Sequence, residues 1–173
     1  MSDVQNVAVL KASFTRPANT TQYTANDLVA GSASVVAGNT VEIPNAVKHP
    51  GEAFRLDVVR LRKTDISLTA ASFRIHLFRA VPTWTVGDNG AGGAITALAV
   101  SSLADHIGYV DVTMDRASVT ASGGAYGKAN PSVGAITISP LVGTSIYVAV
   151  QATSTYTPAS AEVFTIELEG IRS

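Results

Sequence analysis

The chain contains no cysteine, so disulfide-stapled scaffolds, thiol catalysis and cysteine-ligated zinc are excluded. Charge is also scarce: charged residues make up 14% of the 173 residues, and twelve Lys and Arg face thirteen Asp and Glu. A protein held mainly by phosphate contacts needs a basic surface, so we expect no nucleic-acid partner. Apolar runs stay below the roughly 18 residues of a membrane span, and residues 1–6 lack a basic n-region. We therefore expect neither a membrane partner nor a secretory signal.

What is present favours β-structure in a single domain. A length of 173 residues suits one domain. Val and Thr favour strands because branched Cβ atoms suit a pleated surface, whereas Gly and Ser favour turns. Hydrophobic residues reach 46% while charge stays low. Because the cores of subunit interfaces are depleted in charge, we favour an assembled protein over a neutral monomer.

Alternation of apolar and polar residues predicts the strands. The clearest run is Phe54–Lys63, where the apolar parity flips between Val58 and Val59, which suggests a β-bulge or a bend between sheets. In residues 73–79 we expect the odd-numbered apolar side chains to point inward, and Arg74, His76 and Phe78 to point outward. Further strands are predicted at residues 7–14, 40–43, 108–114, 135–138, 145–151 and 164–169.

The remaining segments carry turn signals. Residues 15–40, 87–93 and 121–134 are predicted loops, and one helical turn is predicted at residues 101–106 with Ser102 as its cap. About eight strands without βαβ alternation predict an all-β fold, an antiparallel β-sandwich that is jelly-roll-like. Residues 1–50 would form an extended N-terminal arm with the first strands, and residues 51–173 the sandwich core, as one domain overall.

Residues capable of chemistry are few and scattered. His49, His76 and His106 have no metal-ligating or catalytic spacing, so we interpret each as an ordinary surface or hydrogen-bonded histidine. Glu167 and Glu169 share one strand face, where a solvated surface or cross-strand arginine partners explain them better than an acid–base pair does. We expect no catalytic residue, no metal and no cofactor, and therefore no enzyme.

Aromatic residues outside the predicted strands are candidates for recognition. Trp84 is the only tryptophan, and Tyr23, Tyr126 and Tyr156 fall in predicted loops. Such residues anchor protein interfaces or stack against sugars. Trp84 fits equally well as a core residue that closes one end of the sandwich.

Two stretches carry a family resemblance. The first is residues 14–29, which include Arg16-Pro17-Ala18-Asn19-Thr20-Thr21-Gln22-Tyr23, and the second is residues 73–83, followed by Asp88-Asn89. Together with Leu61-Arg62-Lys63 they resemble virion structural proteins of tailed bacteriophages, of the capsid decoration or cement type. The resemblance covers roughly residues 1–110, and the C-terminal third matches only in style.

The resemblance implies a protein made in the host cytoplasm and carried on the head surface of the virion. Its partners would be the major capsid protein and itself, as a dimer or trimer. We expect the partner contacts at Arg16, Tyr23, Trp84 and Tyr126. Two alternatives remain open: a tail, baseplate or fibre module that recognises host-surface glycans, and a cell-wall hydrolase that uses Glu167 or His76.

Overall fold

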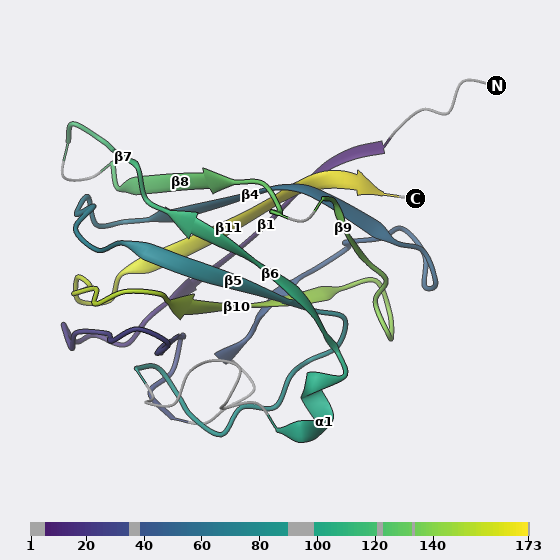
Figure 1. Ribbon diagram of the computed structural model, residues 1–173, viewed down its shortest axis with the longest axis horizontal. Coiled ribbons are helices and arrows are strands. Elements are labelled where there is room, and N and C mark those ends of the chain that lie inside the picture. Colours follow the sequence, from purple (N-terminus) through teal and green to yellow (C-terminus); the bar gives the residue numbers. More distant parts are fainter. Residues whose placement is uncertain (1–5, 35–38, 90–98, 121–122, 133, 173) are drawn as a thin grey trace.

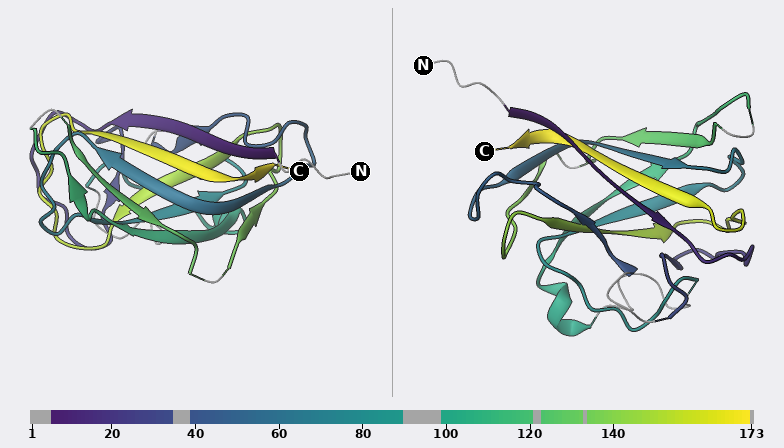
Figure 2. Two further views of the ribbon diagram at one scale, coloured as in Figure 1. Left: turned by 90° about the horizontal axis from the view of Figure 1, so that it is seen from above. Right: turned by 180° about the vertical axis from the view of Figure 1, so that it is seen from behind.

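The computed structural model describes residues 6–34, 39–89, 99–120, 123–132 and 134–172, which form two antiparallel sheets packed face to face (Figures 1 and 2). Sheet A contains β1 (Asn6–Thr15), β11 (Val163–Arg172), β4 (Phe54–Lys63), β8 (Ala125–Ala129) and β7 (Arg116–Ala117) in that order, with β9 (Ile136–Ile138) paired to β4. Sheet B contains β2 (Leu28–Val29), β10 (Ile146–Ala152), β5 (Ser72–Phe78) and β6 (His106–Thr113), with β3 (Val41–Ile43) also paired to β10. The predicted all-β antiparallel sandwich is confirmed.

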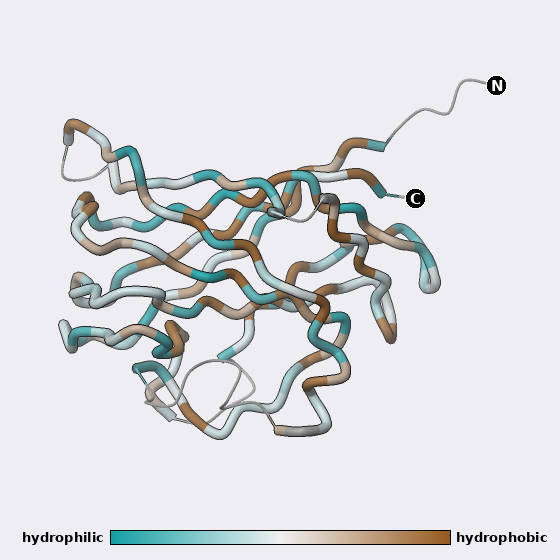
Figure 3. The backbone as a smooth tube through the Cα atoms, viewed as in Figure 1, coloured by the Kyte–Doolittle hydropathy of each residue, from teal (hydrophilic) through white to brown (hydrophobic). Residues whose placement is uncertain are grey.

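The core lies between the two sheets and follows the predicted alternation, which Figure 3 shows as alternating colours along the strands. Phe73 on β5 contacts Tyr156 and Phe164 edge-on, with ring centroids 5.3 and 5.4 Å apart. All three side chains are fully buried. Edge-to-face contacts add to the stabilisation from apolar burial, so this aromatic group is a central part of the core.

Of the two explanations for the parity change in β4, a bulge or a bend between sheets, the structure shows the bulge. Val58 pairs with Glu169 and Leu56 with Gly170, which leaves Asp57 as the additional residue. The inward side chains therefore change from even to odd numbers along the strand. Gly170 opposite the bulge has no room for a side chain, because a Cβ there would lie 1.9 Å from the Arg55 carbonyl oxygen.

Two predictions about the N-terminal and glycine-rich segments are revised. β1 pairs with β11 over its whole length, and β2 and β3 pair with β10, so residues 6–34 and 39–50 are part of the sandwich rather than an arm beside it. Residues 121–134 were predicted to be a loop, but residues 125–129 form β8 and pair with the end of β4. Residues 90–93 of the predicted 87–93 loop lie outside the described residues.

Part of the outer face of sheet B is covered, contrary to the prediction for His76 and Phe78, whereas Arg74 and Asp111 on the same face keep side-chain exposures of 32 and 54%. Both side chains are buried, and Phe78 packs edge-on against Trp84 at 6.0 Å in a second cluster with Leu28. The Trp84 Nε1–H donates to Thr40 Oγ1 at 2.7 Å. Trp84 is thus a core residue, but it covers a sheet face rather than an end of the sandwich.

The helical turn is α1 (Val100–Leu103), which lies beyond the edge of the sheets (Figure 1). Ser102 does not cap it: Ala99 is the N-cap residue, and Ser102 Oγ instead accepts the Thr83 N–H at 2.9 Å. No helix in the described part of the chain is long and apolar enough to cross a membrane.

Candidate functional site

Three of the four residues predicted to contact a partner are buried in their own chain. Arg16, Tyr23 and Trp84 have exposed fractions of 2, 0 and 3%, whereas Tyr126 is 39% exposed. A buried side chain presents no surface to a partner. Of the four positions, the structure therefore leaves only Tyr126 as a surface residue.

Arg16 and Tyr23 belong to a buried polar cluster centred on Asp88. Arg16 Nη2 lies 3.1 Å from Asp88 Oδ2, and Arg16 Nε–H donates to the Tyr23 hydroxyl at 2.8 Å. Tyr23 donates to Asp88 Oδ1 at 2.5 Å, and the Ala30 N–H donates to the same oxygen at 2.9 Å. Burial and the Asp88 charge raise the pKa of Tyr23, so its hydroxyl remains a donor. This cluster fixes the segment after β1 to the segment after Trp84.

A second buried cluster joins Lys63 to Glu162, with Nζ and Oε1 3.3 Å apart. The Tyr156 hydroxyl donates to Glu162 at 2.8 Å, and burial together with that charge raises the pKa of Tyr156. Tyr156 stacks on Tyr23 with a ring distance of 6.4 Å, so the two clusters adjoin. In both clusters the polar groups bond to other groups of the same chain, so we interpret the residues of these clusters as structural.

The structure brings together two histidines that are thirty positions apart in the sequence. His76 Nδ1 and His106 Nε2 are 3.2 Å apart, and His76 Nε2 lies 2.8 Å from Gln151 Oε1. The contact depends on the pairing of β5 with β6, which places His106 opposite Phe78. A short spacing between histidines in the sequence could therefore not have revealed it. Burial lowers the pKa of His76 to about 4 and also lowers that of His106. Among the described residues no group of three or more His, Asp or Glu could hold a metal ion.

The histidine pair predicts a loss of stability in mild acid. His76 must become charged in the unfolded chain near pH 6.5 but only near pH 4 when folded. The unfolded state therefore binds more protons between these values, and stability falls as pH drops from 6.5 to 4, by about 3 kcal/mol in total. Urea unfolding across this range should show the slope, and His76→Gln should remove most of it.

The exposed His49 provides the matched control. His49→Gln should leave the pH dependence as in the parent protein. An unchanged slope in His76→Gln would show that other groups dominate the acid response.

Strand pairing creates a charged surface on the outer face of sheet A, which points away from sheet B. Strand register places Lys11, Glu167, Arg60 and Lys128 in one row across four strands. The next row contains Ser13, Thr165, Arg62, Tyr126 and Arg116. We call Lys11, Arg60, Arg62, Arg116, Lys128 and Tyr126 the cationic face.

The cationic face has more positively charged side chains than carboxylates that pair with them. Glu167 lies 3.8 Å from Lys11 and 3.5 Å from Arg62, and Glu169 lies 2.5 Å from Arg60. No ion pair within the described residues involves the two remaining cations of the face, Arg116 and Lys128. Five cations thus face two carboxylates, on a chain whose net charge is -1.

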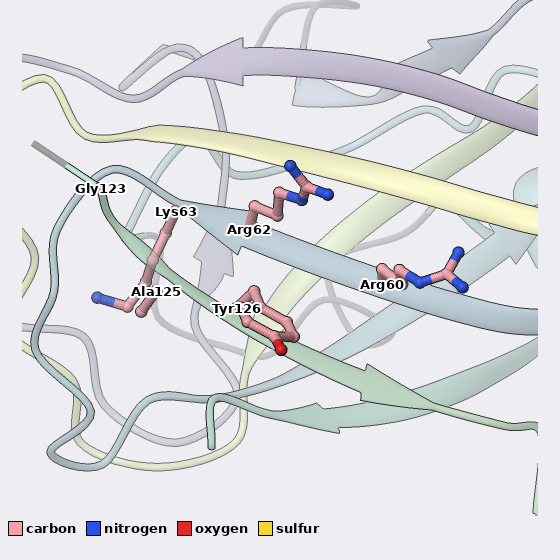
Figure 4. A pocket seen from close by; sticks show the side chains of 6 residues that line it. All are labelled: Arg60, Arg62, Lys63, Gly123, Ala125 and Tyr126. Atoms are coloured by element: carbon pink, nitrogen blue, oxygen red, sulfur yellow. The ribbon is translucent and has the colours of Figure 1, made fainter. Parts of the chain in front are cut away.

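A shallow hollow of about 420 Å³ lies on this face between β4 and β8. Its lining includes Arg60, Arg62 and Tyr126. Figure 4 shows Arg62 extending from β4 toward β11, Arg60 directed along β4, and the Tyr126 ring on β8. A smaller hollow next to it shares Arg62 and adds Lys11 and Thr165. Arg116 lies over the Tyr126 ring at 6.0 Å. The face can therefore offer guanidinium donors and an aromatic surface to an acidic group.

No protein-family model matches the chain, and no curated protein matches its sequence. The cationic face itself was missed in the sequence because it depends on β8. Only the pairing of β8 with β4 and β7 brings Lys128 and Arg116 beside the arginines of β4.

Proposed function

We propose that the protein is a bacteriophage head decoration protein that binds the capsid shell through its cationic face. The observation that carries the proposal is the excess of exposed positive charge around Tyr126 on the rigid outer face of sheet A. Complementary charge steers association and favours the correct partner. The matching surface on the major capsid protein would be acidic.

Two further features support a structural role on a virion. Residues 14–29 and 73–89 resemble decoration proteins of tailed phages. The strand orders β1-β11-β4-β8 and β3-β10-β5-β6 interleave the first and second halves of the chain, as in a jelly roll, an architecture common in viral capsids. A protein that binds only the assembled shell stabilises it by mass action.

The groups that a hydrolase would need are engaged elsewhere. Glu167 and Glu169 are held in ion pairs with cations, and His76 is buried and hydrogen-bonded to Gln151 and His106. Catalysis by a carboxylate pair requires free access to a substrate and separated pKa values. These contacts favour a binding role for the face over a reaction.

The proposal is tested by binding of the protein to empty shells of the phage that encodes it. Empty shells contain no packaged DNA, so any binding must be to protein. Reversing two charges with Arg62→Glu and Lys128→Glu should weaken binding about a hundredfold, roughly tenfold for each lost pair. Wild-type binding should also weaken as salt increases. Bound protein is measured by co-sedimentation with the shells.

Arg55→Glu is the matched control, because Arg55 lies on the same strand and its side chain is 48% exposed, against 58% for Arg62. It should bind as the wild type does. Equal binding by all variants would remove the cationic face from the interface. Absence of the protein from purified virions would refute the decoration role, and binding to host glycans that depends on Tyr126 would support the glycan-recognition alternative.

A further inference from the structure

β1 is a long strand at the open edge of sheet A. It pairs with β11 in an unbroken register of ten residues, and within the described residues it pairs with no other strand. β3 of the other sheet lies beside it without pairing to it. On one side of β1, the backbone N–H and C=O groups therefore have no strand partner among the residues that the structure describes.

The register shows which backbone groups face the open edge. Just beyond the strand, the Arg16 N–H donates to the Glu162 carbonyl at 3.1 Å, in line with the same pairing. Hydrogen-bonded pairs alternate along an antiparallel ladder, so the even-numbered residues of β1 direct their backbone groups to β11. The odd-numbered residues direct theirs outward: Val7, Val9, Lys11, Ser13 and Thr15.

This edge lacks the features that usually protect an exposed strand. Natural proteins block such edges with proline, bulges or several charges. β1 has no proline, no break in its register and a single charge at Lys11. Its first half instead exposes Val7 and Val9 at 68 and 59% on the outer face, with the half-buried Ile171 beside Val7.

We propose that β1 pairs with β1 of a second copy of this chain, antiparallel and about a two-fold axis at Ala8. This register places Val7 of each copy opposite Val9 of the other and joins two apolar patches that each end at the edge. An axis at Lys11 would instead set two ammonium groups against each other. An axis at Ala8 is the one register in which both exposed valines of each strand pair with a valine of the other.

The dimer gives the assembly a property that one copy lacks. Side chains paired across an antiparallel ladder lie on the same face of the sheet, so the two outer faces of sheet A join into one surface. Both cationic faces then point in the same direction, and a dimer can engage two acidic sites at once. The pairing itself does not depend on what the cationic face binds, and it is tested on the purified protein alone.

Sedimentation velocity of the full chain at micromolar concentration is the first test, and a dimer is expected. Val9→Pro removes an outward N–H but leaves the hydrogen bonds to β11 in place, and Val9→Lys adds a charge at the same site. Each should weaken dimerisation about a hundredfold, because the two-fold axis repeats every loss. Val142→Lys, at an exposed valine in the segment before β10, should remain a dimer.

Cysteine cross-linking tests the register, since the chain has no cysteine of its own. Val7→Cys protein mixed with Val9→Cys protein should form a disulfide-linked dimer under mild oxidation. Each variant alone should not, because the diagonal separation of roughly 7–8 Å is too long for a disulfide. The proposal would be overturned if the wild type were a monomer, or if both Val9 variants remained dimers with the native circular dichroism spectrum. It would also be overturned if each cysteine variant alone cross-linked as well as the mixture does.

Discussion

Replacing Asp88 by alanine should lower the free energy of unfolding by about 3–5 kcal/mol. The substitution leaves the Arg16 guanidinium buried without its carboxylate, since the Arg16 side chain is fully buried. It also removes the acceptor of the Tyr23 hydroxyl and of the Ala30 N–H. Urea denaturation at pH 7 measures the change.

Two further variants separate the lost charge pair from a general effect of removing a carboxylate. Asp57→Ala removes a half-exposed carboxylate that pairs with Arg55, and it should cost no more than about 1 kcal/mol. Arg16→Met combined with Asp88→Leu should cost less than Asp88→Ala, because no unpaired charge remains buried. A loss below about 1 kcal/mol for Asp88→Ala would show that water or a neighbouring group replaces the carboxylate.

Replacing Phe73 by alanine should lower the free energy of unfolding by about 3–5 kcal/mol, through lost burial and the cavity left behind. Phe73 is fully buried and contacts the Tyr156 and Phe164 rings, so both aromatic neighbours would lose a packing partner. The same denaturation experiment measures the effect.

Phe73→Leu fills more of the space and should cost less than Phe73→Ala. If the two variants were equally stable, the surrounding side chains would have to collapse into the cavity. A crystal structure of Phe73→Ala would then show the shifted rings.

Strands with one face on the core and the other face in solvent could be predicted from the sequence, because their side chains alternate between these two environments. The strand predicted at residues 54–63 has both of its observed ends, and the parity change at the bulge was visible in the sequence. The prediction failed for Phe78 and His76, because both faces of β5 are covered in the second half of the strand. The segment around Trp84 that covers the outer face has no periodic pattern of its own.

Glycine misled the prediction for residues 121–134. Four glycines and a proline suggested a loop, yet Gly127 lies within β8. A Cβ at Gly127 would lie 2.1 Å from the Thr113 carbonyl oxygen of β6. Glycine there permits a close approach between β8 and β6 rather than a turn. The pairing of β8 with β4 and β7 is what builds the cationic face.

The two stretches that carry the family resemblance meet in three dimensions. Arg16 and Tyr23 come from the first stretch, and Asp88 follows the second, and all three form one buried cluster. The distinctive residues of the resemblance therefore hold the fold together. This explains why they were poor candidates for partner contacts, whereas of the cationic face only Arg62 belongs to a segment that the resemblance singles out.

The pairing of β1 with β11 also sets the order of events during synthesis. Ser13 and Thr165, whose hydroxyls are 2.8 Å apart, are 152 positions apart in the chain. β11 lies between β1 and β4, so neither strand gains this shared neighbour until residues 163–172 have been translated. Contacts between distant parts of a chain form slowly, and unpaired strand edges are exposed meanwhile. A chain that lacks residues 163–172 therefore has no route to a closed sheet A, because β1 and β4 would have no strand between them.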